Sequence, residues 1–506
     1  MITFLVCVAI LVGGYFLYGT FVDKVLAPND AHVTPAKRLA DGIDYVELPW
    51  WKVLLTQFLN IAGLGPIFGA ILGALFGPIA FIWITLGCLF VGSTHDMLVG
   101  YISMKHDGLS ITELVGLYLG KHTQKFMLVF TFILLVLVGV TFTMAPAAWL
   151  NGRIALPSSA SGVPWAWVLI IIAYYIFATI VPVEALIAKL FPPLSVAMLL
   201  ACIILLIALF FNLGDGGFTM MEFRLENLQP QGLSFFPFIF TTIACGAVSG
   251  FHATKSPMMA RCIGKESDAK RVFFGSMIIE GVVALIWAAI TMAILGDSLF
   301  VLRENAAGNM VTMVGYLGGQ GGTVDYMANT LLPGWLATLL IFTAVIIFPI
   351  TSADTGFRSV RLMFADAFKW DQSKVMNRVL VSIPIFAVAW VLTWIDFGII
   401  WRYFAWSNLS IAAIALWVGA RYLATRKKLH WIATLPATLL SYASVSYILQ
   451  APEGFQLGVH FAHGELVSNI VGIVFALVLF GLFIVTAKKA PETLGHLVEE
   501  KVQTAE

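Results

Sequence analysis

The chain has 506 residues, of which 60% are hydrophobic and only 11% are charged. Soluble domains carry about 25% charged residues, so this composition excludes a soluble enzyme and indicates a protein that resides in a lipid bilayer. The formal net charge of +1 argues against a nucleic-acid partner, because such a protein must neutralise many phosphates. The five cysteines show no C-x-x-C spacing, so neither a disulfide framework nor a zinc knuckle is indicated.

Thirteen apolar stretches are long enough to cross a bilayer as helices, since about 20 residues span the hydrocarbon. The first has neither a basic region before it nor a small-residue cleavage site, so we interpret it as a retained helix and not as a signal peptide. In chain order the stretches run approximately over residues 2–21, 53–77, 79–103, 126–150, 165–181, 186–212, 235–260, 272–295, 335–355, 379–394, 399–422, 431–449 and 466–486.

The charges of the connecting loops predict an orientation. Cytoplasmic loops accumulate Lys and Arg. If the N-terminus lies outside, alternation of the two faces places all but four of the 29 basic residues on the inner face, and only Arg153, Arg224, Arg303 and Arg402 remain outside. We therefore expect a multi-pass protein of an inner or plasma membrane, with its N-terminus outside and its C-terminus in the cytoplasm.

Two of the stretches contain glycine clusters near their middles. Glycine and proline free backbone groups from the helical ladder, which is tolerated at membrane depth only where the backbone lines a cavity within the protein. Close helix packing through small residues is the alternative, and it would suffice for one stretch alone. Because both stretches are interrupted at matched positions, we predict two broken helices that bind substrate through Gly63, Leu64, Gly65 and Pro66 in the second stretch and through Gly246, Ser249, Gly250 and His252 in the seventh.

The spacing of the two clusters predicts an inverted repeat. They lie five helices apart, and a repeat of five helices places its second copy upside down, which is typical of secondary transporters. The predicted fold is an all-α polytopic membrane protein with about 13 transmembrane helices and a ten-helix core of two inverted five-helix repeats. The predicted division is an extra N-terminal helix (1–24), a cytoplasmic loop (25–52), the first repeat (53–212), the second, inverted repeat (213–423), two additional C-terminal helices (430–487) and a cytoplasmic tail (488–506).

Ionisable and hydroxyl side chains inside the stretches are few, and charge there is costly, so each is a candidate for function. A buried carboxylate can change its protonation state, and hydroxyls can serve as ligands of a sodium ion, so ion coupling is predicted for His95, Asp96, Glu280, Thr351, Ser352 and Asp354. Lys255, directly after the second glycine cluster, is a further candidate for substrate binding. We expect neither a catalytic residue nor a resident metal or cofactor, apart from H+ or Na+ as the coupling ion.

Three simpler explanations of these residues stay open. Lys255 could form a structural ion pair with Asp96 or Glu280. The hydroxyls of Thr351 and Ser352 could be satisfied within their own helix. A metal site of His95, Asp96 and His252 is weakly supported, because adjacent residues of a helix point to different sides.

Several short motifs occur together and in order between about residues 35 and 425: Asp41-Gly42-Ile43-Asp44-Tyr45, Ile61-Ala62-Gly63-Leu64-Gly65-Pro66, His95-Asp96, the stretch from Ala244 to Ala253, Ser352-Ala353-Asp354-Thr355 and Trp401-Arg402-Tyr403-Phe404. In combination they resemble the bacterial carbon starvation protein A family. The resemblance implies a peptide transporter of the bacterial inner membrane that is induced on starvation, with some members importing pyruvate. It also implies a LeuT-like fold similar to that of the amino acid-polyamine-organocation transporters, with the second to eleventh stretches as the core.

The chain departs from the family at one functionally important place. Larger members continue after Ala253 with a Ser-Ser-Gly-Thr-Thr-Pro run, whereas this chain reads Thr254-Lys255-Ser256-Pro257-Met258-Met259. A cation has therefore entered the segment. This chain is also shorter than those members, which leaves its substrate range open.

The predicted function is secondary active uptake of small peptides during carbon or nutrient starvation, coupled to H+ or Na+ and working by alternating access around the broken helices. A symporter of pyruvate or another small carboxylate is the alternative. A channel or a membrane-embedded metal-dependent enzyme is a further alternative, although the chain has no H-E-x-x-H, no G-x-S-x-G and no lysine-containing phosphate loop. The expected partners are the substrate and the lipid bilayer, and the sequence leaves the oligomeric state open.

Overall fold

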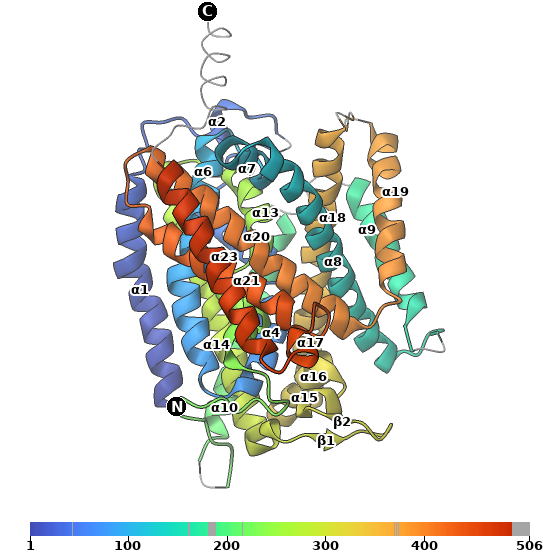
Figure 1. Ribbon diagram of the computed structural model, residues 1–506. Helices are drawn as coiled ribbons and strands as arrows, with labels where there is room; N and C mark the ends of the chain where they lie inside the picture. The colour runs from blue at the N-terminus through green and yellow to red at the C-terminus, as the bar shows by residue number, and fades with distance from the viewer. Residues whose placement is uncertain are drawn as a thin grey trace, which may run out of the picture.

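Long apolar helices run side by side through the molecule in the computed structural model (Figure 1). The structure describes residues 1–487 except 43, 160–161, 181–188, 215, 369, 371 and 373. The predicted cytoplasmic tail, 488–506, lies outside the described residues. Uninterrupted runs of Leu, Ile, Val and Phe form these helices because a helix satisfies every backbone hydrogen bond within its own segment, as a bilayer requires.

Among its described residues, the first half of the chain forms ten helices and short π- and 3-10-helical continuations. The turn Ala74–Phe76 extends α4, and the π-helical Trp83–Gly92 joins α5 to α6. The helices are α1 (Ile2–Leu26), α2 (Pro35–Arg38), α3 (Trp50–Ala62), α4 (Gly65–Gly73), α5 (Ala80–Ile82), α6 (Ser93–Lys105), α7 (Ile111–Leu119), α8 (Lys121–Arg153), α9 (Trp165–Ile180) and α10 (Lys189–Phe211).

The second half, as far as the structure describes it, adds thirteen helices and one small hairpin of β1 (Arg303–Glu304) and β2 (Met310–Val311). Its π-helical segments are Lys270–Phe274 and Phe342–Ile347, and its 3-10 segments are Glu266–Asp268 and Gly296–Phe300. The helices are α11 (Phe235–Thr242), α12 (Ala244–Ala247), α13 (Gly250–Ala260), α14 (Gly275–Leu295), α15 (Met313–Tyr316), α16 (Gly319–Leu331), α17 (Gly334–Ile341), α18 (Phe348–Ala367), α19 (Val375–Leu392), α20 (Phe397–Thr425), α21 (Trp431–Gln450), α22 (Leu457–His460) and α23 (Gly464–Thr486).

The count of membrane spans follows from these bounds. Within the described residues, ten helices are long and apolar enough to cross a membrane, and the pair Trp50–Ala62 and Gly65–Phe76, bent by 48°, makes an eleventh. The two remaining predicted spans are the shorter apolar helix α9 and the interrupted series α11, α12 and α13. The all-α polytopic fold with two broken helices is therefore confirmed.

The two halves are inverted with respect to each other. In the first half, the short helix α7 lies between α6 and α8, at the top of Figure 1. In the second half, α15 and α16 hold the same place in chain order between α14 and α17, and they lie at the bottom. The segment from 296 to 334, between two of the predicted apolar stretches, contains helices and a hairpin. The domain boundaries that we assigned to the repeats stay a prediction.

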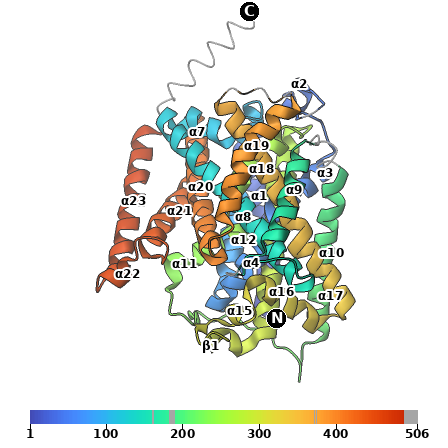
Figure 2. The ribbon, with the colours of Figure 1, turned by 90° about the vertical axis from the view of Figure 1, so that its right-hand side faces the viewer.

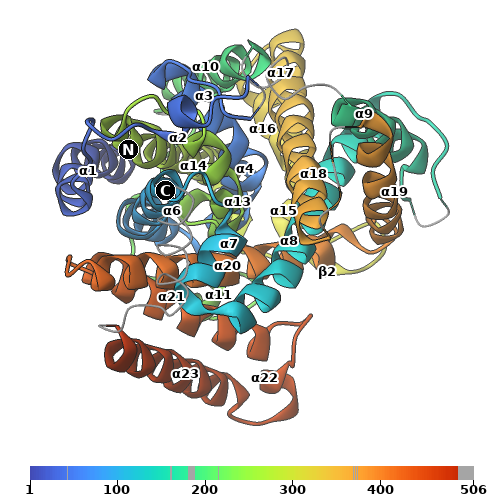
Figure 3. The same ribbon diagram turned by 90° about the horizontal axis from the view of Figure 1, so that it is seen from above.

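The core of the molecule lies around α4, α6, α13 and α14. Figure 3 shows α1, α10, the pair α9 and α19, and the layer of α21 and α23 arranged around these four helices, and Figure 2 shows α23 and α22 at one edge. Trp287 of α14 is only 2% exposed. The two broken helices therefore lie among buried helices and away from the periphery.

The loop between α10 and α11 is anchored to the start of α1. Glu222 accepts hydrogen bonds from the Thr3 backbone N–H, at 2.9 Å, and from its hydroxyl, at 2.6 Å. The terminal ammonium of Met1 and these hydrogen bonds lower the pKa of Glu222 to about 2. The carboxylate therefore stays ionised at neutral pH and holds the loop against α1.

Candidate functional site

The first break separates α3 from α4 at Gly63. This residue adopts φ 42° and ψ −137°, a left-handed backbone conformation that favours glycine. Pro66 follows in the first turn of α4, where its missing N–H costs nothing. The predicted interruption of the second stretch is therefore present and is caused by Gly63 and Pro66.

The second break separates α12 from α13 at Val248 and Ser249, which are both extended. A side chain from α20 satisfies the freed backbone: the Asn408 Oδ1 atom accepts the Phe251 N–H at 2.6 Å and the Ser249 hydroxyl at 2.9 Å. Asn408 Nδ2 also donates to Cys245 Sγ at 3.0 Å. Sequence reasoning missed Asn408, although a fully buried amide in the apolar stretch 399–422 was a usable signal.

The two breaks lie against each other. A Cβ atom built on Gly65 would lie 2.1 Å from Cys245 Cβ, and one on Gly246 would lie 3.8 Å from Pro66 Cα. A Cβ on Gly69 would lie 3.1 Å from the Thr242 carbonyl oxygen. The alternative of close packing is thus correct for Gly65, Gly69 and Gly246, whereas Gly63 serves the break itself. Packing and interruption act together, and they bring the freed backbone of both helices to one place.

A carboxylate–histidine network lies next to the second break and consists of His95, Asp96, His252 and Glu280. All four side chains are fully buried. The Nδ1 atoms of His95 and His252 lie 2.7 Å and 3.0 Å from the two oxygens of Asp96. The Nε2 atom of His252 lies 3.4 Å from Glu280 Oε2. Three helices, α6, α13 and α14, therefore meet through ionisable groups.

The contacts of Asp96 and Glu280 in this network differ. An ionised Asp96 can only accept hydrogen bonds, so both histidines donate their Nδ1–H atoms to it. The Nε2 atom of His252 faces Glu280, but neither this nitrogen nor either Glu280 oxygen has a hydrogen-bond partner among the described residues. The network is linked to the second break because His252 follows Gly250 by two residues in α13.

Lys255 belongs to a different environment. Its Nζ atom donates to the Thr355 hydroxyl at 3.0 Å and lies 3.5 Å from Ser359 Oγ, both on α18. It also lies 4.8 Å from the centroid of the Phe251 ring. In the described part of the chain, no carboxylate forms an ion pair with Lys255, so the proposed pairing with Asp96 or Glu280 is wrong. The reason is geometric, because Lys255 points to α18 whereas His252 points to α6 and α14.

The hydroxyls of α18 divide between two roles. Ser352 Oγ donates to the Leu59 carbonyl oxygen of α3 at 3.2 Å, one turn before the first break. Thr351 Oγ1 donates to the Phe348 carbonyl oxygen of its own helix at 2.9 Å. Asp354 is 1% exposed, and its Oδ2 atom has no hydrogen-bond partner among the described residues. Ser352 therefore joins α18 to the broken helix, and Thr351 does not.

Metal binding finds no geometric support in the described residues, where no group of three or more His, Cys, Asp or Glu side chains could hold a metal ion. This includes His95, Asp96 and His252, the set considered above. His95 and His252 are both hydrogen-bonded to Asp96, so their Nδ1 atoms and the Asp96 oxygens, which a metal would need, are already engaged.

Comparison with known proteins decides the family. The sequence profile described as "Carbon starvation protein CstA" matches residues 1–163 and 147–320. The chain belongs to the carbon starvation protein CstA family. Peptide transporter CstA of Bacillus subtilis is 28% identical over 87% of this CstA chain and 88% of its own length. Peptide transporter CstA of Escherichia coli is 24% identical over 86% of this chain and 78% of its own length. An uncharacterized membrane protein of Haemophilus influenzae is 37% identical over 58% of this chain and 91% of its own.

Solved structures show the same fold in transporters. The manganese transporter of Eremococcus coleocola matches with a TM-score of 0.50, 13% identity, and coverage of 88% of this CstA chain and 98% of its own. MHP1, a nucleobase-cation-symport-1 family transporter, matches with a TM-score of 0.53 and 14% identity. The match covers 88% of this chain and 93% of MHP1. The fold is thus LeuT-like, and this CstA family member is a multi-pass membrane protein of a transporter family.

Proposed function

We propose that this chain is a secondary active transporter that imports small peptides during carbon or nutrient starvation. The observation that carries the proposal is the meeting of two broken helices in the core, where Gly65 packs against Cys245 and Gly246 packs against Pro66. Peptides offer amide, ammonium and carboxylate groups, which the backbone at paired helix breaks binds in transporters. The names of the relatives in Bacillus subtilis and Escherichia coli support the peptide as substrate.

Uptake is coupled to H+ or Na+ through two different places. For H+, the carrier is Glu280, a buried carboxyl group that lies 3.4 Å from His252 and can take up or release a proton when α13 moves relative to α14. For Na+, the first place to look is the junction of Ser352 with the Leu59 carbonyl, where a hydroxyl and a carbonyl oxygen already converge. Alternating access is then a motion of the two breaks against the surrounding helices. The N-terminus lies outside the plasma membrane, and the C-terminus lies in the cytoplasm.

Pyruvate is the second candidate substrate, and Lys255 favours it. A fully buried ammonium that is held by hydroxyls can receive a substrate carboxylate. A keto acid would use this single charge, whereas a peptide would also need an acceptor for its ammonium group.

Uptake into proteoliposomes tests the proposal. The purified chain is given labelled dialanine or labelled pyruvate, with an inward H+ gradient, an inward Na+ gradient or neither. We expect dialanine to accumulate under one of the two gradients. The variant Glu280→Gln removes the titratable group, and Asp297→Asn, at the exposed end of the same helical run, is the matched control. Equal dialanine levels with and without both gradients would contradict coupling, and accumulation of pyruvate alone would replace the peptide.

A further inference from the structure

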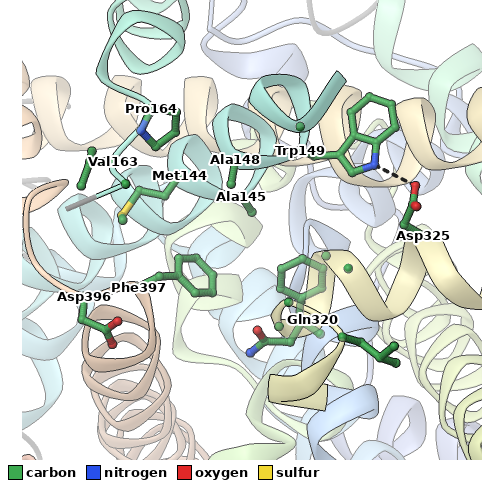
Figure 4. A pocket seen from close by; sticks show the side chains of 18 of the residues that line it. Met144, Ala145, Ala148, Trp149, Val163, Pro164, Gln320, Asp325, Asp396 and Phe397 are labelled. Carbon is green, nitrogen blue, oxygen red and sulfur yellow. Dashed lines mark hydrogen bonds between the residues drawn. The ribbon is translucent and has the colours of Figure 1, made fainter. Parts of the chain in front are cut away.

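A cavity of about 740 Å³ lies on the side of the molecule that carries Arg153, which we expect to be extracellular. Figure 4 shows that its wall is formed by the C-terminal part of α8, the start of α16 and the start of α20. Ligand pockets for small molecules commonly measure about 300–1,000 Å³, so a short peptide fits this space. None of the predicted substrate or ion residues lines it.

One end of the cavity is built to receive a carboxylate. The helix α16 begins there without a side-chain cap, and Gly318 and Gly319 at its start face open space. The first N–H groups of a helix have no partner within it and attract anions. Gln320 adds a donor: its side chain is 9% exposed, lines the cavity in Figure 4, and has no hydrogen-bond partner among the described residues.

The other end carries an acceptor for an ammonium group. Asp396 lies beside Phe397 at the start of α20, away from Asp325 in Figure 4. One of the oxygens of this exposed carboxylate accepts the Ile399 N–H at 3.2 Å and caps the helix, and the carboxylate forms no ion pair among the described residues. The other charged lining residues neutralise each other, because Arg153 forms an ion pair with Asp325. Asp396 is therefore the one unpaired charge among the described residues that line the cavity.

An aromatic layer joins this cavity to the broken helices. Phe68 of α4 lines the cavity and lies 5.7 Å, between ring centroids, from Trp401. Trp401 packs on Phe404, and Phe404 packs on Phe142, whose ring covers Gly63. A continuous series of aromatic contacts therefore runs from the cavity to the first break.

We propose that the cavity is a binding site for zwitterionic short peptides on their way to the two breaks. The start of α16 and Gln320 bind the terminal carboxylate, and Asp396 binds the terminal ammonium. The inference deepens the proposed function and rests on it. The site is also selective. A keto acid or a peptide with a blocked amine has no ammonium group for Asp396 to bind and, as an anion, is repelled by it.

Competition binding to the purified full-length chain tests the site. Labelled dialanine is displaced by unlabelled dialanine, N-acetyl-dialanine or dialanine amide. We expect each blocked peptide to bind about tenfold more weakly, since each loses one charge-assisted hydrogen bond. Asp396→Asn retains a good helix cap and removes only the charge, so it should abolish the discrimination against the acetylated peptide. Gln320→Glu should reverse the preference for the free carboxylate. Glu304→Gln, on the same face but outside the cavity, should change neither ratio.

The outcomes separate this site from the proposed function. If Asp396→Asn discriminates against N-acetyl-dialanine as strongly as the unmodified chain does, the cavity site is overturned, even where proteoliposomes still accumulate dialanine. Absence of dialanine binding also overturns it. Loss of discrimination in the variant supports the site, even where uptake fails and the proposed function falls.

Discussion

The two broken helices occupy equivalent places in the two repeats, yet they are held open by different means. The first break is a property of its own backbone, because Gly63 turns the chain and Pro66 starts α4. The second break depends on other helices, since Asn408 of α20 binds its freed N–H group. The first interruption is therefore determined by neighbouring residues in the sequence, whereas the second requires the folded core.

The ionisable contacts cluster on α13, the helix that follows the second break. Asp96 and Glu280 reach His252 from α6 and α14, and Thr355 reaches Lys255 from α18. Gln57 of α3 and Asn408 of α20 add hydrogen bonds to Ser256 and Phe251, so polar groups of several helices hold α13. At the first break, Ser352 reaches the carbonyl of Leu59. We therefore expect the first break to respond to changes of shape and the second to changes of charge.

The largest effect is expected at the second break, from Asp96→Asn. The amide cannot accept hydrogen bonds from both histidines with both of its atoms, and loss of one partner of a buried ion pair costs about 3–5 kcal/mol. We expect a lower melting temperature in detergent and loss of gradient-driven uptake. The exposed Asp297→Asn is the control, and unchanged uptake by Asp96→Asn would show that the network plays no part in coupling.

The next effect is expected at the first break, from Gly63→Ala. The residue has φ +42°, and an added Cβ would lie 2.5 Å from the Phe142 ring, so strain and overpacking together should cost about 2–4 kcal/mol in the unfolding free energy. Gly120→Ala has a positive φ of 94° with nothing within 4 Å, so it isolates the backbone strain. Melting temperatures that are equal for the two variants would contradict a shape-determined first break.

Asn408→Ala tests the support of the second break. It leaves the buried N–H of Phe251 without an acceptor, which costs about 1–3 kcal/mol. Thermal unfolding should show this loss. Thr425→Ala, at the end of the same helix and bonded only to its own helix, is the matched control. An Asn408→Ala variant as stable as this control would mean that α13 holds its position without Asn408.

The smallest effect on stability is expected from Lys255→Gln. The side chain bonds only to hydroxyls, so the variant should keep its melting temperature and its dependence on the ion gradient. If Lys255 binds the substrate carboxylate, the KM of uptake should rise about tenfold with little change in kcat. A change in ion dependence instead of KM would move Lys255 from substrate binding to coupling.

Much of the fold was predictable from local sequence, because bilayer crossing imposes a length and a composition on each helix. The thirteen stretches and both interruptions follow from runs of apolar residues and from glycine and proline within them. The cost of charge inside the apolar stretches also singled out Asp96 and Glu280, which meet at His252. These features depend on residues close together in the chain.

The rest depends on side-chain direction and on contacts across the chain. His252 and Lys255 are three residues apart, yet one points to α6 and α14 and the other to α18, so the alternative of an ion pair of Lys255 with Asp96 or Glu280 was wrong. Asn408 lies 157 residues from Phe251, to which it binds. The cavity at the start of α16 could not be predicted, because the segment that forms this part of its wall has the composition of a glycine-rich loop.

Cryo-electron microscopy of the full-length chain in lipid nanodiscs with saturating dialanine shows whether a peptide binds between the two broken helices. We expect ligand density between the two breaks, in contact with the backbone near Gly63 and Ser249, together with a displaced aromatic layer at Phe68 and Trp401. Continuous helices in place of the breaks, or a peptide bound far from both of them, would contradict it.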